Sequence, residues 1–317
     1  RSRGPNVDES EIGLIRELIA IQGQRHALPL DEQRREYDRA QEVFSTAVAA
    51  DVDSLRIGRC PADLVRSRGA LDGTRILYLH GGAYVLGSPR SHRHVAAAIG
   101  ESAAASVLVL DYRRAPEDPF PSAVEDAVSA YEWVLDQGQD PSRLVVAGDS
   151  AGGGLALAMM FALRDAGIRL PAAGVCISPW VDLTCAGGSH RAKSESDPVL
   201  RTDILRQMAA LYLRGANARS ALASPIFGNL EGLPPLLVQV GSEEILLDDA
   251  RELARRTAAA GTPTTLEEWP GMIHVWHWYF PLLKEARAAI ATIGEFIRAH
   301  TGAAAPAATA PGARRTR

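Results

Sequence analysis

The segment Gly148-Asp-Ser150-Ala-Gly152 places a serine between two glycines, where an apolar stretch over 143–149 meets one rich in Ala, Leu and Met. This pattern is typical of a tight turn from a strand into a helix, which exposes the serine hydroxyl as a nucleophile above a sheet. The helix N-terminus behind it favours developing negative charge. A phosphate-binding loop is the rival interpretation, but the chain has neither G-x-G-x-x-G nor G-K-[ST]. On this motif alone, a serine that is only a turn residue remains an alternative interpretation.

A second pair of glycines, in His80-Gly81-Gly82-Ala83, directly follows another apolar stretch, residues 74–80. Attack on a carbonyl carbon requires backbone N–H groups that stabilise the oxyanion, and adjacent glycines let the backbone approach a substrate closely. The predicted donors are the amides of Gly81, Gly82 and Ala151. We interpret His80 as a residue that holds this loop by a hydrogen bond rather than as a base.

Two of the eight histidines, His274 and His277 in GMIHVWHW, are the candidates for a general base. His274 follows a predicted strand and the turn PGM, whereas the aromatic neighbours of His277 are typical of a packed side chain. Their HxxH spacing could suggest a metal, but no third ligand lies nearby, so no metal site is predicted. The other six histidines are not candidates. His26 and His300 lie in terminal segments, and His92 and His94 belong to a polar helix start. His190 lies in an inserted segment, and His80 belongs to the glycine loop.

The stretch GSEEILLDDA, residues 241–250, contains four carboxylates directly after an apolar run. Asp248 and Asp249 fall in the first turn of a predicted helix, where the helix dipole is a sufficient reason for acidic residues. Glu243 and Glu244 fall in the preceding loop. The loop acids are therefore the first candidates to orient a catalytic histidine, and the sequence pattern alone does not choose between them.

The elements that must position these residues alternate regularly from residue 52 onward. Nearly continuous Val, Leu and Ile stretches between helical patterns predict a mostly parallel sheet covered on both faces. The predicted helices after residue 90 are 91–104, 121–137, 151–166, 247–260 and 274–299. The predicted strands are 52–59, 64–69, 74–80, 106–112, 143–149, 172–178, 235–241 and 264–269.

A gap of nearly sixty residues without a strand separates residues 178 and 236 and predicts an inserted cap. The first fifty residues have helical patterns that could join it. The predicted organisation is cap helices over 1–50, the first part of a catalytic core over 51–181, the cap insertion over 182–224, the second part of the core over 225–300 and a disordered tail over 301–317.

Composition argues against several classes of protein. The net charge of −4 and pI of about 6.1 give no reason to expect a nucleic-acid partner. No stretch approaches the 18 apolar residues that a membrane span requires. The three cysteines, Cys60, Cys176 and Cys185, have neither disulfide nor zinc spacing, so we expect no cofactor or metal and a cytoplasmic location.

Both glycine motifs, together with four further stretches, resemble the bacterial hormone-sensitive-lipase-like esterases, or family IV, of the α/β-hydrolase fold. The stretches are DYRRAPEDPFPSAVEDA, SPWVDLT, GLPPLLVQVGSEEILLDDA and WPGMIHVW, in order between about residues 50 and 300. The resemblance implies a mostly parallel eight-stranded sheet with helices on both faces and a helical cap.

The resemblance also implies a catalytic triad in the order serine, acid, histidine. The histidine after Gly-Met-x in the family is His274 here, and the family's Gly-x-x-Asp-Pro-Leu places the acid at Glu244. This chain departs from the family in three places, because a glutamate replaces the aspartate, Ile245 replaces the proline and Ala83 replaces the last glycine of HGGG. Asp248 remains the alternative acid, since its side chain has the aspartate length.

The implied function is hydrolysis of carboxylic esters with short to medium acyl groups, through a Ser150-His274-Glu244 triad and an acyl-enzyme. A lactonase or a deacetylase of a small metabolite would use the same residues, and a non-catalytic ligand-binding relative is the third alternative. A homodimer is a family expectation. The expected pocket residues are Tyr84, Trp180, Leu205, Met208, Tyr212 and Trp276.

Overall fold

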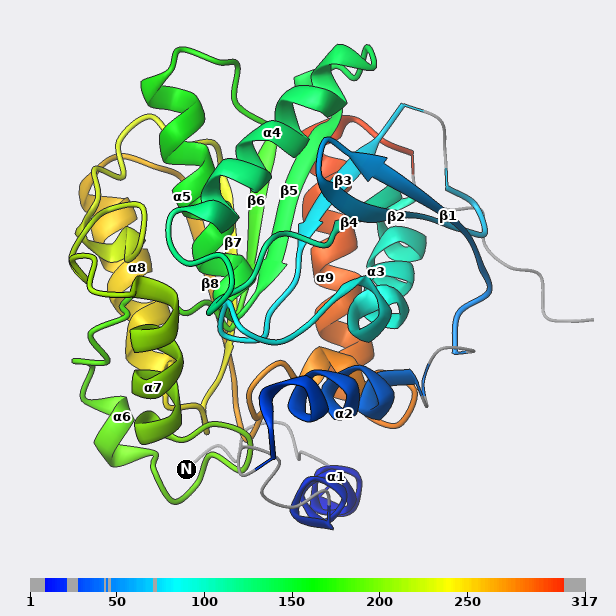
Figure 1. Cartoon of the computed structure of the whole chain (residues 1–317). Coiled ribbons are helices and arrows are strands. Elements are labelled where there is room, and N and C mark those ends of the chain that lie inside the picture. Colours follow the sequence, from blue (N-terminus) through cyan, green and yellow to red (C-terminus); the bar gives the residue numbers. More distant parts are fainter. Residues whose placement is uncertain (1–8, 22–27, 43, 45–46, 71–72, 305–317) are drawn as a thin grey trace, which may run out of the picture.

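The computed structural model describes residues 9–21, 28–42, 44, 47–70 and 73–304 (Figure 1). Most of the predicted disordered tail and His26 lie outside the described residues. One eight-stranded sheet forms the centre of the molecule, in the order β1-β2-β4-β3-β5-β6-β7-β8. The strands are β1 (Ala50–Ile57), β2 (Cys60–Ser67), β3 (Arg75–Leu79), β4 (Ser106–Leu110), β5 (Leu144–Asp149), β6 (Ala173–Ile177), β7 (Leu236–Gly241) and β8 (Thr264–Trp269).

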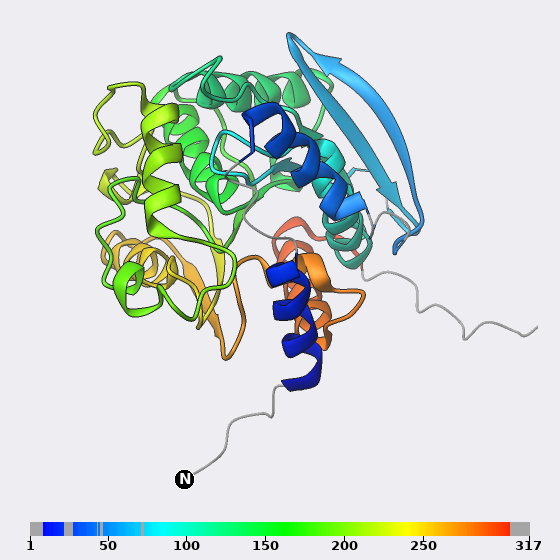
Figure 2. The same cartoon turned by 60° about the horizontal axis from the view of Figure 1, so that its bottom comes forward.

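All neighbouring strands from β4 to β8 pair in parallel, whereas β1 pairs antiparallel with β2, and β2 antiparallel with β4. Every residue of β5 and β7 is buried, which explains why their sequences are nearly continuous apolar runs. β1 lies at the edge of the sheet and is mostly exposed, and Figure 2 shows the β1–β2 hairpin extending at one side of the molecule. The prediction of a mostly parallel eight-stranded sheet is confirmed.

Helices cover both faces of this sheet, and the side chains of β3 show how. Leu77 and Leu79 belong to the buried cluster that contains residues of α4, α5 and α8, whereas Ile76 and Tyr78 belong to the cluster that contains residues of α3 and α9. The helices are α1 (Glu9–Ile21), α2 (Leu30–Glu42), α3 (Pro89–Ala103), α4 (Ser122–Asp136), α5 (Ala151–Asp165), α6 (Ser189–Ala192), α7 (Thr202–Leu213), α8 (Leu247–Ala259) and α9 (Lys284–Thr301), with short 3-10 turns at η2 (Pro141–Arg143), η3 (Pro225–Phe227) and η4 (Trp276–Tyr279).

The predicted helix 274–299 is divided in the structure into η4 and α9. Val275 adopts a left-handed conformation with a φ of 49°, which a continuous α-helix cannot contain. The first two strands also begin earlier than predicted, since the hairpin turn lies at Gly58 and Arg59.

The four helices outside the core layers, α1, α2, α6 and α7, lie at one end of the sheet (Figures 1 and 2). The Arg16 guanidinium on α1 donates a hydrogen bond to the Ser196 carbonyl oxygen of the insertion, at 3.0 Å. The N-terminal helices and the insertion are thus joined directly.

Candidate active site

Ser150 lies on the sharp turn between β5 and α5 with a φ of 53° and a ψ of −119°. Its amide donates to the carbonyl oxygen of Ile177 at 2.8 Å, which holds this strained conformation in place. A Cβ on Gly148 would collide with the carbonyl of Gly152, and a Cβ on Gly152 would collide with the carbonyl of Leu79. Both glycines of the motif are therefore required by close backbone approach.

Glu244 and His274 form a buried hydrogen-bonded pair beside this turn. The Nδ1–H of His274 donates to Glu244 Oε2 at 2.8 Å, and the other carboxylate oxygen accepts from Ser178 Oγ at 2.7 Å and the Gly241 amide at 2.6 Å. Ser178 Oγ in turn accepts from the Val275 amide at 3.2 Å, so it connects the acid to the histidine loop. The loop after β7 therefore supplies the acid that orients His274 Nδ1–H.

The remaining acids of the 241–250 stretch have other partners. Asp248 accepts the Ser189 amide at 2.8 Å, and Asp249 accepts the amides of Val181 and Asp182, where the insertion begins, at 3.0 Å each. Both aspartates thus do more than start α8, because they anchor the inserted segment to that helix. Glu243 is partly exposed and lies 3.6 Å from the Lys193 ammonium group.

The histidine beside Glu244 is more basic than free imidazole. Burial lowers the pKa of His274, but the hydrogen bond and the charge of Glu244 raise it more, so the net pKa is raised. His277, three residues later, is fully buried against the side-chain amide oxygen of Gln239 at 2.7 Å, and burial lowers its pKa to about 3. A neutral, packed His277 agrees with its interpretation from the sequence.

The glycine loop after β3 contains three successive residues with positive φ: Gly82 at 109°, Ala83 at 55° and Tyr84 at 62°. The amide of Gly81, predicted as an oxyanion donor, donates instead to Asp149 Oδ1 at 3.0 Å, and this contact corrects the prediction for Gly81. The amides of Gly82, Ala83 and Ala151 have no hydrogen-bond acceptor among the described residues.

His80 is a structural residue, as its position in the sequence suggests. Its Nδ1–H donates to the Gly81 carbonyl oxygen at 2.8 Å, and its ring stacks on Tyr112 with centroids 4.1 Å apart. Burial lowers the pKa of His80 well below the ordinary value, which keeps the ring neutral.

His92 and His94 lie near the start of α3, as predicted, but both side chains are buried, so the description of this helix start as polar is wrong. His92 lies 3.3 Å from the carboxylate of Asp149, a contact that we do not predict from the sequence. The available signal is helical spacing, since Val95, Ala96 and Ile99 share the buried side of α3 with His92.

A cavity of about 430 Å³ is lined by both Ser150 and His274. Its lining includes Leu205 and Met208, two of the expected pocket residues. The other four expected residues are at most 1% exposed and pack in the hydrophobic core: Tyr84, Trp180, Tyr212 and Trp276. Residues of the N-terminal helices, which the sequence does not assign to the pocket individually, complete the lining: Ile19, Ala20, Gln33 and Tyr37.

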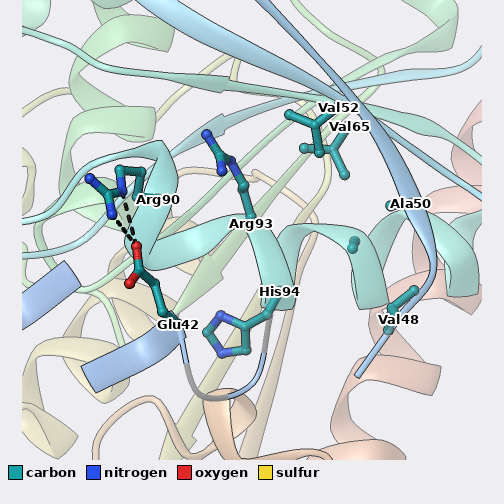
Figure 3. Close-up of a pocket in the computed structure, with 9 residues that line it drawn as sticks. Glu42, Val48, Ala50, Val52, Val65, Arg90, Arg93 and His94 are labelled. Carbon is teal, nitrogen blue, oxygen red and sulfur yellow. Dashed lines mark hydrogen bonds and ion pairs between the residues drawn. The ribbon is translucent and has the colours of Figure 1, made fainter. Parts of the chain in front are cut away.

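Figure 3 shows a second cavity of about 500 Å³, between α3, the β1–β2 hairpin and the end of α2. It shares no lining residue with the cavity at the serine. The Nε of Arg90 donates to Glu42 at 3.0 Å, and Arg93 lies 2.6 Å from Asp63. Its arginines are therefore already paired with carboxylates.

Within the described ranges, no group of three His, Cys, Asp or Glu side chains is arranged to hold a metal ion. No helix in the same ranges is long and apolar enough to cross a membrane. Cys60, Cys176 and Cys185 are free and buried.

Comparison with known proteins agrees with this architecture. A family model described as the α/β hydrolase fold matches residues 76–278. The chain is 54% identical over 292 residues to an acetyl-hydrolase of Streptomyces hygroscopicus, covering 92% of this chain and 97% of the relative. It is 35% identical to the esterase LipU of Mycobacterium tuberculosis, covering 84% and 92% of the two chains.

Solved structures give the same result at the level of the family. An esterase from the bacterial hormone-sensitive lipase family is 46% identical, with a TM-score of 0.86 over 95% of this chain and 100% of that one. An esterase/lipase from an uncultured bacterium is 44% identical, with a TM-score of 0.87 and the same coverage. The chain is thus a hydrolase of the carboxylesterase type, and it belongs to the hormone-sensitive-lipase-like family of the α/β-hydrolase fold.

Proposed function

We propose that this chain hydrolyses carboxylic esters with short to medium acyl groups through a Ser150-His274-Glu244 triad and an acyl-enzyme. The observation that carries the proposal is the 2.8 Å hydrogen bond between His274 Nδ1 and Glu244 beside a cavity lined by Ser150. With its proton on Nδ1, the imidazole presents a free Nε2 lone pair as a base.

In the proposed first step, His274 Nε2 removes the proton of Ser150 Oγ while this oxygen attacks the ester carbonyl carbon. The amides of Gly82, Ala83 and Ala151 are proposed to stabilise the oxyanion, because they donate to no described residue. His274 then passes the proton to the departing alcohol. In the second step, water gives a proton to His274 and attacks the acyl-enzyme, and Ser150 leaves with that proton.

The cavity supports a small substrate with an apolar acyl group. Its volume of about 430 Å³ lies in the range of small-molecule sites. The insertion contributes a largely aliphatic wall that consists of Pro198, Val199, Leu200, Ile204, Leu205 and Met208. We propose that residues 1–50 and 182–224 act together as the cap, since both contribute residues to this lining.

A deacetylase of a small metabolite is the second candidate, with the same triad. It is favoured by one observation, the 54% identity to a protein named acetyl-hydrolase. A lactonase would also use these residues, and a ligand-binding protein without turnover is the remaining alternative.

The test is a series of p-nitrophenyl esters from acetate to dodecanoate, followed by lactones and N-acetylated amines, with the wild type and Ser150→Ala. We expect the highest kcat/KM with acyl chains of two to about six carbons, and a loss of kcat on the order of 10⁴- to 10⁶-fold in Ser150→Ala. An organophosphate should label Ser150 alone. Labelling of another serine would refute the triad, and a folded wild type without turnover would favour a ligand-binding protein.

A further inference from the structure

A fully buried carboxylate, that of Asp149, lies directly beneath the glycine loop and next to the proposed nucleophile. One of its oxygens, Oδ1, lies 2.8 Å from the Tyr78 hydroxyl, 3.0 Å from the Gly81 amide and 3.3 Å from His92 Nε2. A Cβ on Gly81 would collide with the other oxygen, so the glycine loop fits closely over this side chain.

A buried carboxylate requires a charge partner or complete hydrogen bonding, because removal of a charge from water costs several kcal/mol. Burial raises the pKa of Asp149, yet His92 and the Tyr78 hydroxyl lower it more, and the net pKa lies below the ordinary value. Burial raises the pKa values of the neighbouring tyrosines and lowers that of the neighbouring histidine His80, which favours their neutral forms. The tyrosines are Tyr37 on α2, Tyr78 on β3 and Tyr112 in an adjoining loop. Of the described side chains in hydrogen-bond contact with Asp149, only that of His92 can carry a positive charge.

The contacts around His92 hold its ring in a fixed place beside Asp149. Its Nδ1 lies 2.9 Å from the Ser91 hydroxyl oxygen and 3.2 Å from the Ser88 carbonyl oxygen, and the Ser91 hydroxyl lies 2.9 Å from the same carbonyl oxygen. The hydroxyl proton can point to Nδ1 or to the carbonyl oxygen, so a ring with its proton on Nε2 satisfies these contacts. Nε2 faces the carboxylate of Asp149, to which an Nε2–H donates.

The Gly81 amide lies 3.0 Å from Asp149 Oδ1 and 3.3 Å from His92 Nε2. The shorter distance assigns this amide to the carboxylate, so His92 Nε2 is left to donate its own proton to Asp149.

We propose that the buried hydrogen-bonded pair of Asp149 and His92 is a positioning device for the oxyanion loop. Asp149 binds the Gly81 amide and so orients the next peptide, whose Gly82 amide is proposed to contact the oxyanion. His92 in turn fixes the position of the Asp149 carboxylate. This inference rests on the proposed function only for its kinetic consequence, since the hydrogen bond of the pair is measurable without turnover.

The hydrogen bond of the pair is tested by ¹⁵N NMR of histidine-labelled protein. The His92 signals are assigned from their loss in His92→Gln. We expect a protonated Nε2 of His92 whose shift changes in Asp149→Asn. An unprotonated Nε2 would overturn the pair, whatever the activity of the enzyme.

The positioning role is tested with Asp149→Asn and His92→Gln, and with the double variant. We expect kcat to fall roughly 10- to 100-fold in each single variant while KM changes less than about twofold, because the loop acts on the transition state. Affinity for a trifluoromethyl ketone, which forms a covalent oxyanion adduct, should fall in the same proportion as kcat. Unchanged kcat in a folded Asp149→Asn variant would refute the role.

The double variant distinguishes the Asp149–His92 pair from general packing. His92→Gln leaves the buried carboxylate without its histidine partner, and adding Asp149→Asn removes the charge of that carboxylate, so the double variant should be more stable than His92→Gln. Additive losses of stability would contradict the pair. His94→Gln is the matched control, since His94 lies on the same helix and its Nε2 lies 3.3 Å from the Trp278 carbonyl oxygen instead. In this control kcat should stay within about threefold.

Discussion

Glu244 and Asp249 lie five residues apart, and both carboxylates are buried, yet their surroundings differ. Glu244 receives three hydrogen bonds, one of them from a basic histidine. Asp249 receives two backbone amides through one oxygen, while its other oxygen has no hydrogen-bond partner among the described residues and lies 3.9 Å from His190 Nε2. Burial, together with the nearby charges of Asp182 and Asp248, raises the pKa of Asp249 to about 8. Burial alone therefore does not determine the role of an acid, because a short hydrogen bond from a histidine separates the proposed catalytic acid from the anchoring one.

Of the substitutions that test this comparison, Glu244→Gln should have the largest effect on kcat. An amide in place of the carboxylate favours the wrong tautomer of His274, and we expect kcat to fall roughly 10³- to 10⁴-fold. Asp248→Asn and Glu243→Gln are the controls, and both should stay near wild type under identical conditions. If Asp248→Asn shows the large loss and Glu244→Gln does not, the acid of the triad is misassigned.

The pH dependence of kcat/KM should also depend on Glu244, because this carboxylate raises the pKa of His274. Protonated His274 cannot act as a base, and its raised pKa places the acid limb of the wild type above the ordinary imidazole value of 6.5. In Glu244→Gln the raising contribution of the carboxylate is lost and burial remains, so the residual activity should extend to lower pH. An acid limb that does not move would show that Glu244 does not set this pKa.

Ser178→Ala should have a smaller effect, because it removes one of the three donors to Glu244. A hydrogen bond to a charged group contributes about 1.5–3 kcal/mol, and part of this loss should appear as a reduction in kcat of roughly tenfold with KM little changed. Ser178→Thr, which retains the hydroxyl group, is the comparison variant. Equal losses in both variants would point to packing rather than to the hydrogen bond.

Asp249→Asn should change stability and leave chemistry nearly untouched. The folded chain binds the Asp249 proton more tightly than the unfolded chain, so this group's contribution to stability decreases as pH rises from about 4 to about 8. Asparagine removes that dependence, and the variant should gain on the order of 1 kcal/mol over the wild type near pH 8, with kcat within about twofold. Urea unfolding at pH 6 and pH 8 measures both values. A variant that loses stability equally at both pH values would contradict the raised pKa.

Much of the architecture could be predicted from the sequence because it rests on local patterns. Nearly continuous apolar strands between helices predict the parallel sheet, and glycines beside Ser150 predict the tight turn that the structure contains. The choice of Glu244 depended on the family resemblance, since spacing alone left Glu243 equally available. Local patterns are therefore sufficient for the elements but not for the assignment of each acid.

What could not be predicted depends on contacts between distant segments. The Gly81 amide is bound by Asp149, a residue 68 positions later, and no local pattern indicates this contact. The aromatic residues Tyr84 and Tyr212 stack in the core with centroids 3.9 Å apart. Neither the nearness of Tyr84 to the glycine loop nor the position of Tyr212 on the apolar side of a cap helix reveals which way the rings face. The individual residues of α1 and α2 that line the cavity also could not be identified from the sequence.

The cavity at Ser150 has a floor and a roof of different origin, and this has an evolutionary consequence. The floor consists of residues that follow or end β3, β5 and β8. At the β5 turn, even a single methyl group at Gly148 or Gly152 would collide with the backbone. The roof consists of side chains from α1, α2 and the insertion, which the chemistry does not contact. Substitutions in the roof can accumulate with little cost to the reaction, so substrate range is free to diverge among descendants of this enzyme. Laboratory selection for new substrates should accordingly find its accepted substitutions in residues 9–42 and 197–208 first.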